Sequence, residues 1–283
     1  ILGMNRKLLI KASTKFIPVT LVTMVIGFFA VGGMGMLLGK GFAHSVMYVS
    51  MPMMAGGMGA GITPLSQIYA SGLAHGSQAA IFSQLAPAVT FGNIMAIIGA
   101  LSISKVFANT KYNGHGTLIS ATKEELERPK IKLDAQRIGV GMLFAFTLLM
   151  VGCLLNNFFP KVHEYAFMII IVFIIKATNT VPKQLEESVI MFNEVVMTNL
   201  THAVLAGIGL ALIDLKTLAS ALTWQFVILC LTSVVAMGLA SWFLGKILGM
   251  YPVETAIGAG MINNSMGGTG NIAVLSASDR MEM

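Results

Sequence analysis

The sequence predicts an all-α integral membrane protein that contains an inverted repeat and two re-entrant hairpins. Three observations predict it: an apolar composition, a glycine-rich motif that occurs twice, and the number of membrane spans between its two copies. Mean hydropathy is +0.80, and only 11% of the residues are charged, against about a quarter in soluble proteins. In a chain surrounded by membrane lipid, the net charge of +6 is typical of basic cytoplasmic loops and does not indicate a nucleic-acid partner.

The first 104 residues are expected to form the first part of the repeat. Residues 17–39 carry no charge and are long enough to cross roughly 30 Å of hydrocarbon as a helix. Residues 41–72 are too rich in Gly, Ser and Met for an ordinary span and too apolar for a solvated loop, which predicts a re-entrant hairpin. Residues 78–104 form the next span.

A basic, hydrophilic stretch follows at residues 105–137 and is predicted to be a cytoplasmic loop by the positive-inside rule. Its cationic residues are Lys105, Lys111, Lys123, Arg128, Lys130, Lys132 and Arg137. Basic residues near the N-terminus place the start of the chain on the same side, in agreement with the two spans between them. Thr122 and Glu125 have the spacing of a capping box, which predicts a short surface helix in the loop.

Residues 138–283 are expected to form the second part of the repeat. Four spans are predicted, at 138–159, 163–177, 196–213 and 223–245, with an interfacial helix at 182–195 and a second re-entrant hairpin at 250–276. Because four spans separate this hairpin from the cytoplasmic loop, it enters the membrane from inside, whereas the first hairpin enters from outside. The two hairpins therefore form an inverted-topology repeat, on which many secondary transporters are built.

The same motif marks both hairpins: MPMMAGGMGAGITPLS begins at Met51, and NNSMGGTGNIAVLS begins at Asn263. Superposition places Gly56, Gly57 and Gly59 on Gly267, Gly268 and Gly270 at an offset of 211 residues, and Ile62, Leu65 and Ser66 on Ile272, Leu275 and Ser276 at an offset of 210. Glycine permits torsions and close approaches that other residues avoid, so GG-x-G inside an apolar stretch predicts the tip of a hairpin. Secondary transporters place their binding sites in such broken helices.

The two tips offer different chemistry to a ligand. The first offers mainly backbone N–H groups, which can bind a carboxylate as helix N-termini bind anions. The second adds amide and hydroxyl side chains. We therefore predict a substrate-binding site made of Gly56, Gly57, Met58, Gly59, Asn264, Ser265, Gly267, Gly268, Thr269 and Gly270. Oxygen atoms also suit sodium, a hard cation, for which the candidates are Gly56, Asn263, Asn264 and Ser265.

Several of these features have an alternative interpretation. GG-x-G also allows helices to pack closely, as small-xxx-small motifs do, although its duplication favours a binding site. Arg280 fits a membrane-interface anchor and a clamp for a carboxylate equally well, and Asn93, Ser83 and Gln84 fit either a cavity lining or helix packing. The sequence contains no Ser/His/Asp set, paired intramembrane aspartates or nucleotide loop, which argues against an enzyme. No cofactor is predicted beyond a coupling ion, Na⁺ or H⁺.

The stretches MAGGMGAGITPLSQIYA and NNSMGGTGNIAVLSASDRMEM resemble the paired GG-x-G hairpins of the 2-hydroxycarboxylate transporter family, bacterial carriers of citrate, malate and lactate. The resemblance covers essentially the whole chain. It implies a homodimeric, elevator-type secondary transporter of the cytoplasmic membrane, with a scaffold domain and a moving domain that holds both hairpins. Family members work by symport with sodium or protons, or exchange malate or citrate for lactate. The chain is expected to be a fragment that lacks N- and C-terminal helices, and the family's substrate-binding arginine is expected beyond Met283.

Two departures from the family's pattern concern the substrate. Citrate-selective sodium symporters of the family carry Asn where this chain has Met58 and Arg where it has Met266. A thioether cannot neutralise a carboxylate, so the resemblance implies malate, or a broader range of di- and tricarboxylates, rather than citrate alone. The alternative hypothesis from the residues is a channel in which two half-helix hairpins form a selectivity pore.

Overall fold

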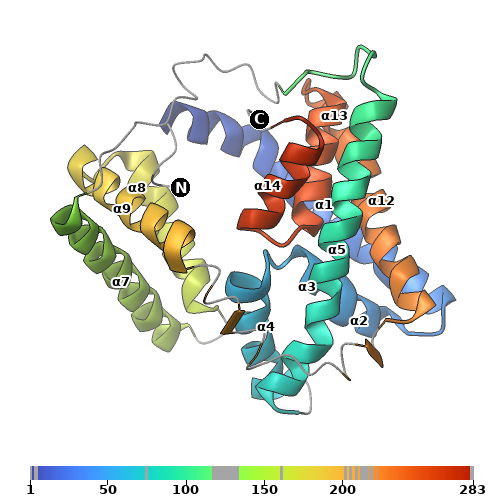
Figure 1. Cartoon of the computed structure of the whole chain (residues 1–283), viewed down its shortest axis with the longest axis horizontal. Coiled ribbons are helices and arrows are strands. Elements are labelled where there is room, and N and C mark those ends of the chain that lie inside the picture. Colours follow the sequence, from blue (N-terminus) through green and yellow to red (C-terminus); the bar gives the residue numbers. More distant parts are fainter. Residues whose placement is uncertain are drawn as a thin grey trace. The chain divides into compact units, whose positions relative to one another are not determined.

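The computed structural model describes residues 6–73, 76–116, 134–159, 162–200 and 222–280, together with residues 2, 203, 206, 207, 210, 216, 219 and 220 (Figure 1). Every regular element in this part of the chain is a helix, which confirms the all-α prediction. Four of the described helices are long and apolar enough to cross a membrane: Ser13–Leu37, Gln78–Val106, Ala135–Phe158 and Trp224–Ile247. They agree with an integral membrane protein.

The chain divides into two compact units. The smaller unit contains Ile1–Ser13 and Ala121–Val204, and the larger contains Thr14–Ser120 and Leu205–Met283. The surface helix predicted at Thr122 to Glu125 lies outside the described residues, as does much of the span predicted at 196–213. Both GG-x-G motifs fall in the larger unit, so their mutual geometry can be described.

The smaller unit contains the helices α7 (Ala135–Phe158), α8 (Glu164–Thr178), α9 (Lys183–Val195) and η4 (Val196–Leu200). Asp134 caps α7, because its side chain accepts hydrogen bonds from the N–H groups of Gln136 and Arg137. Helix α8 ends at Asn179 in the left-handed conformation, and Pro182 precedes α9. Helix α7 packs against both α8 and α9.

Two ion pairs join α9 to its neighbours. Lys176 Nζ on α8 lies 2.7 Å from Glu186 Oε2, and Arg137 Nη2 on α7 lies 2.8 Å from Glu187 Oε2. The side chains of Lys176 and Glu186 are only 9% and 14% exposed, so each of these charges depends on the other for compensation. Glu186 and Glu187 therefore connect α9 to α8 and α7.

The described residues of the larger unit form three long helices and two broken ones. The long helices are α1 (Arg6–Leu37, from Thr14 onward), α5 (Gln78–Val106) and α12 (Trp224–Ile247). The first broken helix has one arm of α2 (Phe42–Ser45), η1 (Val46–Ser50) and α3 (Met51–Met54), and a second arm of η2 (Met58–Ile62), α4 (Thr63–Ile68) and η3 (Tyr69–Leu73). The second broken helix has one arm of α13 (Pro252–Thr255), η5 (Ala256–Met261) and η6 (Ile262–Asn264), and a second arm, α14 (Gly268–Ala277). Helix α5 packs against α12 and α14 (Figure 1).

A single offset of 210 residues relates the two broken helices and the long helices that precede them. Helix α1 ends at Leu37 and α12 at Ile247, and the first arms cover residues 42–54 and 252–264. Gly39 and Gly249 follow the long helices with nearly the same left-handed torsion, φ 73° and φ 72°. The structure therefore contains an internal repeat that stays in register from the end of each long helix to the start of the second arm.

The offset of 211 predicted for the glycines is wrong by one residue. The second arms begin at residues 58 and 268, so the residues directly before them, Gly57 and Gly267, are equivalent, and Gly56 is equivalent to Met266. Aligning the two GG pairs by residue type shifts the glycines by one position relative to the register of the helices. The backbone instead requires glycine at the last residue of each break, and the apolar residues that follow already had the offset of 210.

Helices α1 and α12 meet at equivalent positions. A β-carbon on Gly27 would lie 2.8 Å from Cγ of Met237, and these two residues are 210 positions apart. In a two-fold arrangement, a residue near the axis contacts its own equivalent. A two-fold relation between the repeats is what an inverted repeat requires.

Candidate functional site

The breaks of the two broken helices lie against each other, backbone to backbone. A β-carbon on Gly57 would overlap the carbonyl oxygen of Met266, and one on Gly267 would overlap the carbonyl oxygen of Gly56. Gly57 is equivalent to Gly267 and Gly56 to Met266, so each repeat makes the same contact with the other. Because φ is +103° at Gly57 and +73° at Gly267, both positions require glycine for its conformation as well as for its size.

Each break is followed directly by the N-terminus of a helix. After the first break, the N–H groups of Gly61 and Ile62 donate to Gly57 O at 3.2 and 2.9 Å; after the second, Asn271 N donates to Gly267 O at 2.8 Å. The N–H groups ahead of these donors lie in the first helical turn, where no carbonyl of the same helix can accept from them. These first-turn N–H groups belong to Met58, Gly59, Ala60, Gly268, Thr269 and Gly270, beside the positive ends of two helix dipoles.

Asn264 ties the second broken helix to α12. Its fully buried side chain donates from Nδ2 to Gly260 O at 2.9 Å and approaches Met237 Sδ at 3.3 Å. Its Oδ1 accepts a hydrogen bond from Ser233 Oγ at 2.7 Å. Because both polar atoms of the amide are committed to the protein, Asn264 positions the arm that leads to the break.

Asn263 and Ser265 lie on either side of Asn264 and make local contacts. Asn263 Nδ2 donates to a backbone carbonyl one turn earlier at 2.8 Å. Ser265 Oγ lies within hydrogen-bonding distance of Ile262 O (2.8 Å) and of Asn271 Oδ1, so it connects the two arms across the break. Thr269 belongs to α14, and its side chain lies outside the described part of the structure.

Helix α5 supports the second break through Asn93. Its Oδ1 accepts a hydrogen bond from Met266 N at 3.2 Å, and the same oxygen faces Gly270, where a β-carbon would lie 2.5 Å away. At the neighbouring Gly92, a β-carbon would lie 2.9 Å from Asn264 O. Asn93 therefore joins the site; the signal in the sequence was an amide inside an otherwise apolar span.

The two methionines of the tips share an apolar environment. Met58 and Met266 both pack against a buried cluster that includes Ile62 and Leu85. Apolar side chains contribute no charge, so these two positions cannot compensate a carboxylate in a buried site. The side chains of Met58 and Met266 therefore leave any charge compensation at the tips to other groups.

Arg280 forms a buried ion pair with Glu254. Its Nε lies 3.1 Å from Glu254 Oε1, and the two side chains are 4% and 0% exposed. Its Nη2 donates to Asn113 Oδ1 at 2.8 Å, and its Nη1 bonds to Ser104 Oγ and Ser278 O. The guanidinium is thus neither exposed as an interface anchor nor available as a clamp for a carboxylate, the two roles that the sequence allowed.

Glu254 is the residue that the sequence analysis missed. Besides Arg280, its carboxylate accepts hydrogen bonds from the N–H groups of Gly114 at 2.8 Å and Gly116 at 3.2 Å. The pair therefore holds the segment after α5 against both ends of the second broken helix. The only signal in the sequence is a single acidic residue in an apolar stretch.

The sequence matches known proteins over its whole length. The sequence model of the 2-hydroxycarboxylate transporter family matches residues 1–283. The chain is 83% identical over 283 residues to the malate transporter MleP of Lactococcus lactis subsp. lactis (strain IL1403), covering 100% of this chain and 67% of that protein. It is 49% identical over 281 residues to the citrate transporter CitP of Lactococcus lactis subsp. lactis, and 37% identical over 292 residues to the Na(+)-malate symporter of Bacillus subtilis (strain 168), in both cases covering 99% of this chain and 63% of the relative.

The chain thus spans about two thirds of the length of these relatives. The family match runs through both breaks and through the helices that precede them. The chain therefore belongs to the 2-hydroxycarboxylate transporter family.

Proposed function

We propose that the protein is a secondary transporter that carries 2-hydroxycarboxylates across the bacterial cytoplasmic membrane and releases them chemically unchanged. The observation that carries this proposal is the reciprocal contact between Gly57 and Met266 and between Gly267 and Gly56. It brings the N-terminal ends of two helices to one place in an apolar protein. A carboxylate needs such compensation, because burying an unpaired charge is strongly unfavourable.

The preferred substrate in this proposal is malate, with citrate as a weaker one. Two negative charges match two helix N-termini, whereas a third carboxylate would face the thioethers of Met58 and Met266, which pack against apolar side chains. The relative at 83% identity is named a malate transporter and the one at 49% a citrate transporter. Both names support the substrate class, and their order of identity supports malate.

Transport is coupled either to Na⁺ or H⁺ symport or to exchange with lactate. Asn263, Ser265 and the carbonyl of Gly56 place oxygen atoms at or beside the breaks, and oxygen ligands suit a hard cation. Asn264 contributes by holding its arm in place, because its amide forms hydrogen bonds to α12 and to that arm. The relative at 37% identity is named a Na(+)-malate symporter, which supports sodium.

The two broken helices act as re-entrant hairpins in the moving domain of a homodimeric elevator. Both belong to one compact unit, and α7, α8 and α9 belong to the other, a division that suits a moving domain and a scaffold. Apolar first and second arms of about a dozen residues are too short to cross the bilayer singly, as expected of re-entrant segments.

Uptake of labelled malate and citrate into proteoliposomes of the full-length protein tests the proposal. We expect malate uptake that rises with an inward sodium gradient or with lactate loaded inside, and lower citrate uptake. Unlabelled malate inside the vesicles should accelerate entry of labelled malate, because only a carrier shows counterflow. Uptake without counterflow would instead favour a channel, and no uptake of either acid under any gradient would overturn the proposed substrate class.

A further inference from the structure

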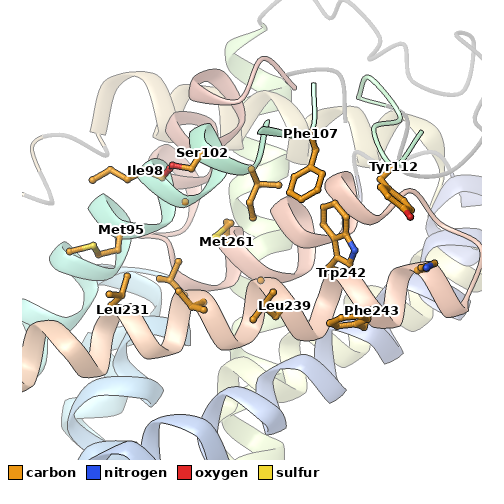
Figure 2. A pocket seen from close by; sticks show the side chains of 16 residues that line it. Met95, Ile98, Ser102, Phe107, Tyr112, Leu231, Leu239, Trp242, Phe243 and Met261 are labelled. Carbon is orange, nitrogen blue, oxygen red and sulfur yellow. The ribbon is translucent and has the colours of Figure 1, made fainter. Parts of the chain in front are cut away.

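An apolar groove runs between α5 and α12 in the larger unit (Figure 2). Its volume is about 580 Å³, within the range of roughly 300–1,000 Å³ that is usual for ligand sites. Figure 2 shows Met95 and Leu231 toward one end and Phe107, Tyr112 and Trp242 toward the other. Met95 on α5 and Phe107, the residue after α5, are twelve positions apart, which corresponds to about 18 Å along a helix axis, so the groove is long and suits an extended hydrocarbon chain.

The lining of the groove is almost entirely apolar. Among the described residues that line it, the polar side chains are Ser102, Tyr112, Trp242 and Lys246, and none is a carboxylate. Most of the wall consists of apolar residues on α5 and α12, and several of these are well exposed, including Leu239 at 56%. A polar metabolite would lose its hydration here without gaining hydrogen bonds, whereas an acyl chain would lose nothing.

Positive charge is concentrated at one end of the groove. Lys246 Nζ and Lys111 Nζ each lie 5.6 Å from the centroid of the Tyr112 ring, within the range of cation–π contacts. Neither lysine forms an ion pair with any carboxylate that the structure describes. Two exposed ammonium groups therefore converge on one aromatic ring and are complementary to an anion at the mouth of the groove.

This end has the composition of a membrane–water interface. Helices α5 and α12 both end there, at Val106 and Ile247. Aromatic residues gather at this end (Figure 2): Phe107 and Tyr112 from the segment after α5, and Trp242 and Phe243 from α12. Tyrosine and tryptophan are enriched at the level of lipid headgroups, and lysines mark the cytoplasmic side. The charged end of the groove therefore lies at the level of the phosphates of the cytoplasmic leaflet.

The equivalent surface of the first repeat lacks these features. In the register of 210 residues, Trp242, Phe243 and Lys246 on α12 correspond to Gly32, Gly33 and Met36 on α1. The shared architecture of the repeats consequently does not require an aromatic and cationic end at this place. The second repeat carries it as an added feature.

We propose that this groove binds an anionic phospholipid, with one acyl chain between α5 and α12 and the phosphate at Lys111 and Lys246. Basic pockets between transmembrane helices on the cytoplasmic side are known to bind anionic headgroups. A zwitterionic lipid can fill the groove but leaves the two ammonium groups without a net negative partner. The site is separate from the two breaks and does not depend on which carboxylate is transported.

The test is native mass spectrometry of the purified full-length protein, titrated with phosphatidylglycerol or with phosphatidylcholine of the same acyl chains. We expect tighter binding of phosphatidylglycerol. The double variant Lys111→Ala/Lys246→Ala should bind it about 25-fold more weakly, roughly fivefold for each lysine, with little change for phosphatidylcholine. Val235→Trp, at a lining position that is 47% exposed, should fill the groove and weaken both lipids while the lysines stay in place.

Lys40→Ala is the matched control, because Lys40 is an exposed lysine that follows α1 and does not line the groove. It should bind both lipids as the wild type does. Equal binding of the two lipids by the wild type would overturn the proposal, as would full phosphatidylglycerol binding by the double variant or by Val235→Trp. Malate uptake is measured separately, so a protein that binds the lipid but carries no malate would refute the proposed function and leave this inference standing.

Discussion

Met54 occupies in the first broken helix the position that Asn264 occupies in the second, 210 residues later. Thr23 is likewise the equivalent of Ser233, whose hydroxyl donates to the Asn264 amide. Met54 has no amide oxygen that could accept a hydrogen bond from the Thr23 hydroxyl. Thr23 Oγ1 and Ser50 Oγ are the two buried polar side-chain atoms, among the described residues, that lack a hydrogen-bond partner. One repeat therefore has a satisfied polar connection where the other has two unsatisfied hydroxyls.

This difference predicts opposite results for two matched substitutions. Thr23→Val replaces an unpartnered hydroxyl with a methyl group of the same shape, so the free energy of unfolding should stay constant or rise. Ser233→Ala leaves Asn264 Oδ1 buried without its donor, which should lower the free energy of unfolding by about 1–3 kcal/mol. Thermal unfolding of the purified variants in one detergent measures both, and an equal loss in the two variants would contradict the prediction.

The contact between the two breaks predicts a strong effect of one added methyl group. Gly57→Ala and Gly267→Ala each put a β-carbon into a backbone carbonyl of the other break and force a residue with a side chain to a positive φ. Initial rates of malate uptake should fall at least tenfold, with the protein still present in the membrane. Gly33→Ala is the control, because a β-carbon there meets no atom within 4 Å; a similar loss in all three would show that the effect is not specific to the breaks.

The Glu254–Arg280 pair predicts a large loss of stability when one partner is removed. Arg280→Met leaves the fully buried carboxylate without its cation, which should lower the free energy of unfolding by about 3–5 kcal/mol. Adding Glu254→Gln to that variant should restore part of the loss, because the uncompensated charge disappears.

Hydrogen exchange provides the local readout for this pair. The amides of Gly114 and Gly116 donate to Glu254, so they should exchange faster in Glu254→Gln than in the wild type. Unchanged protection of both amides would mean that the carboxylate does not hold the segment after α5.

A substitution at Met266 is expected to change the preference of the protein between malate and citrate. Met266→Arg places a cation next to the second break, where it can compensate a third carboxylate, so the ratio of citrate to malate uptake should rise by about tenfold, equivalent to roughly 1.4 kcal/mol. Met266→Gln, which adds polarity without charge, should leave the ratio near that of the wild type. The measurement is kcat/KM for both acids in proteoliposomes, and the same ratio in all three proteins would exclude position 266 from substrate selection.

The long helices were predictable from the sequence because uninterrupted apolar runs define them. The span predicted at 223–245 corresponds to α12 at Trp224–Ile247, and the one predicted at 78–104 to α5 at Gln78–Val106. The breaks were also predictable, since paired glycines in an apolar stretch indicate an interrupted helix. Their register was not, because it depends on which glycine has a positive φ, and the letters of a GG pair do not reveal that.

The roles of the polar residues were less predictable, because they depend on contacts between distant parts of the chain. Asn264 was predicted as a ligand from its place beside the tip, yet its donor Ser233 comes from a helix 31 residues earlier. Arg280 and Glu254 are 26 residues apart, and Asn113, which completes their network, comes from the segment after α5. The spacing of these residues in the sequence does not indicate that they contact one another.

The constant offset of 210 residues also limits how this part of the protein can change. Between the end of each long helix and the tip, only Leu38, Gly39, Met51 and Gly57 recur as Leu248, Gly249, Met261 and Gly267, yet the number of residues is the same. A deletion or insertion of one residue in an arm would rotate everything beyond it by about 100° and shift it by about 1.5 Å, which would separate the two glycines. Substitutions in the arms are therefore tolerated far more readily than changes in their length.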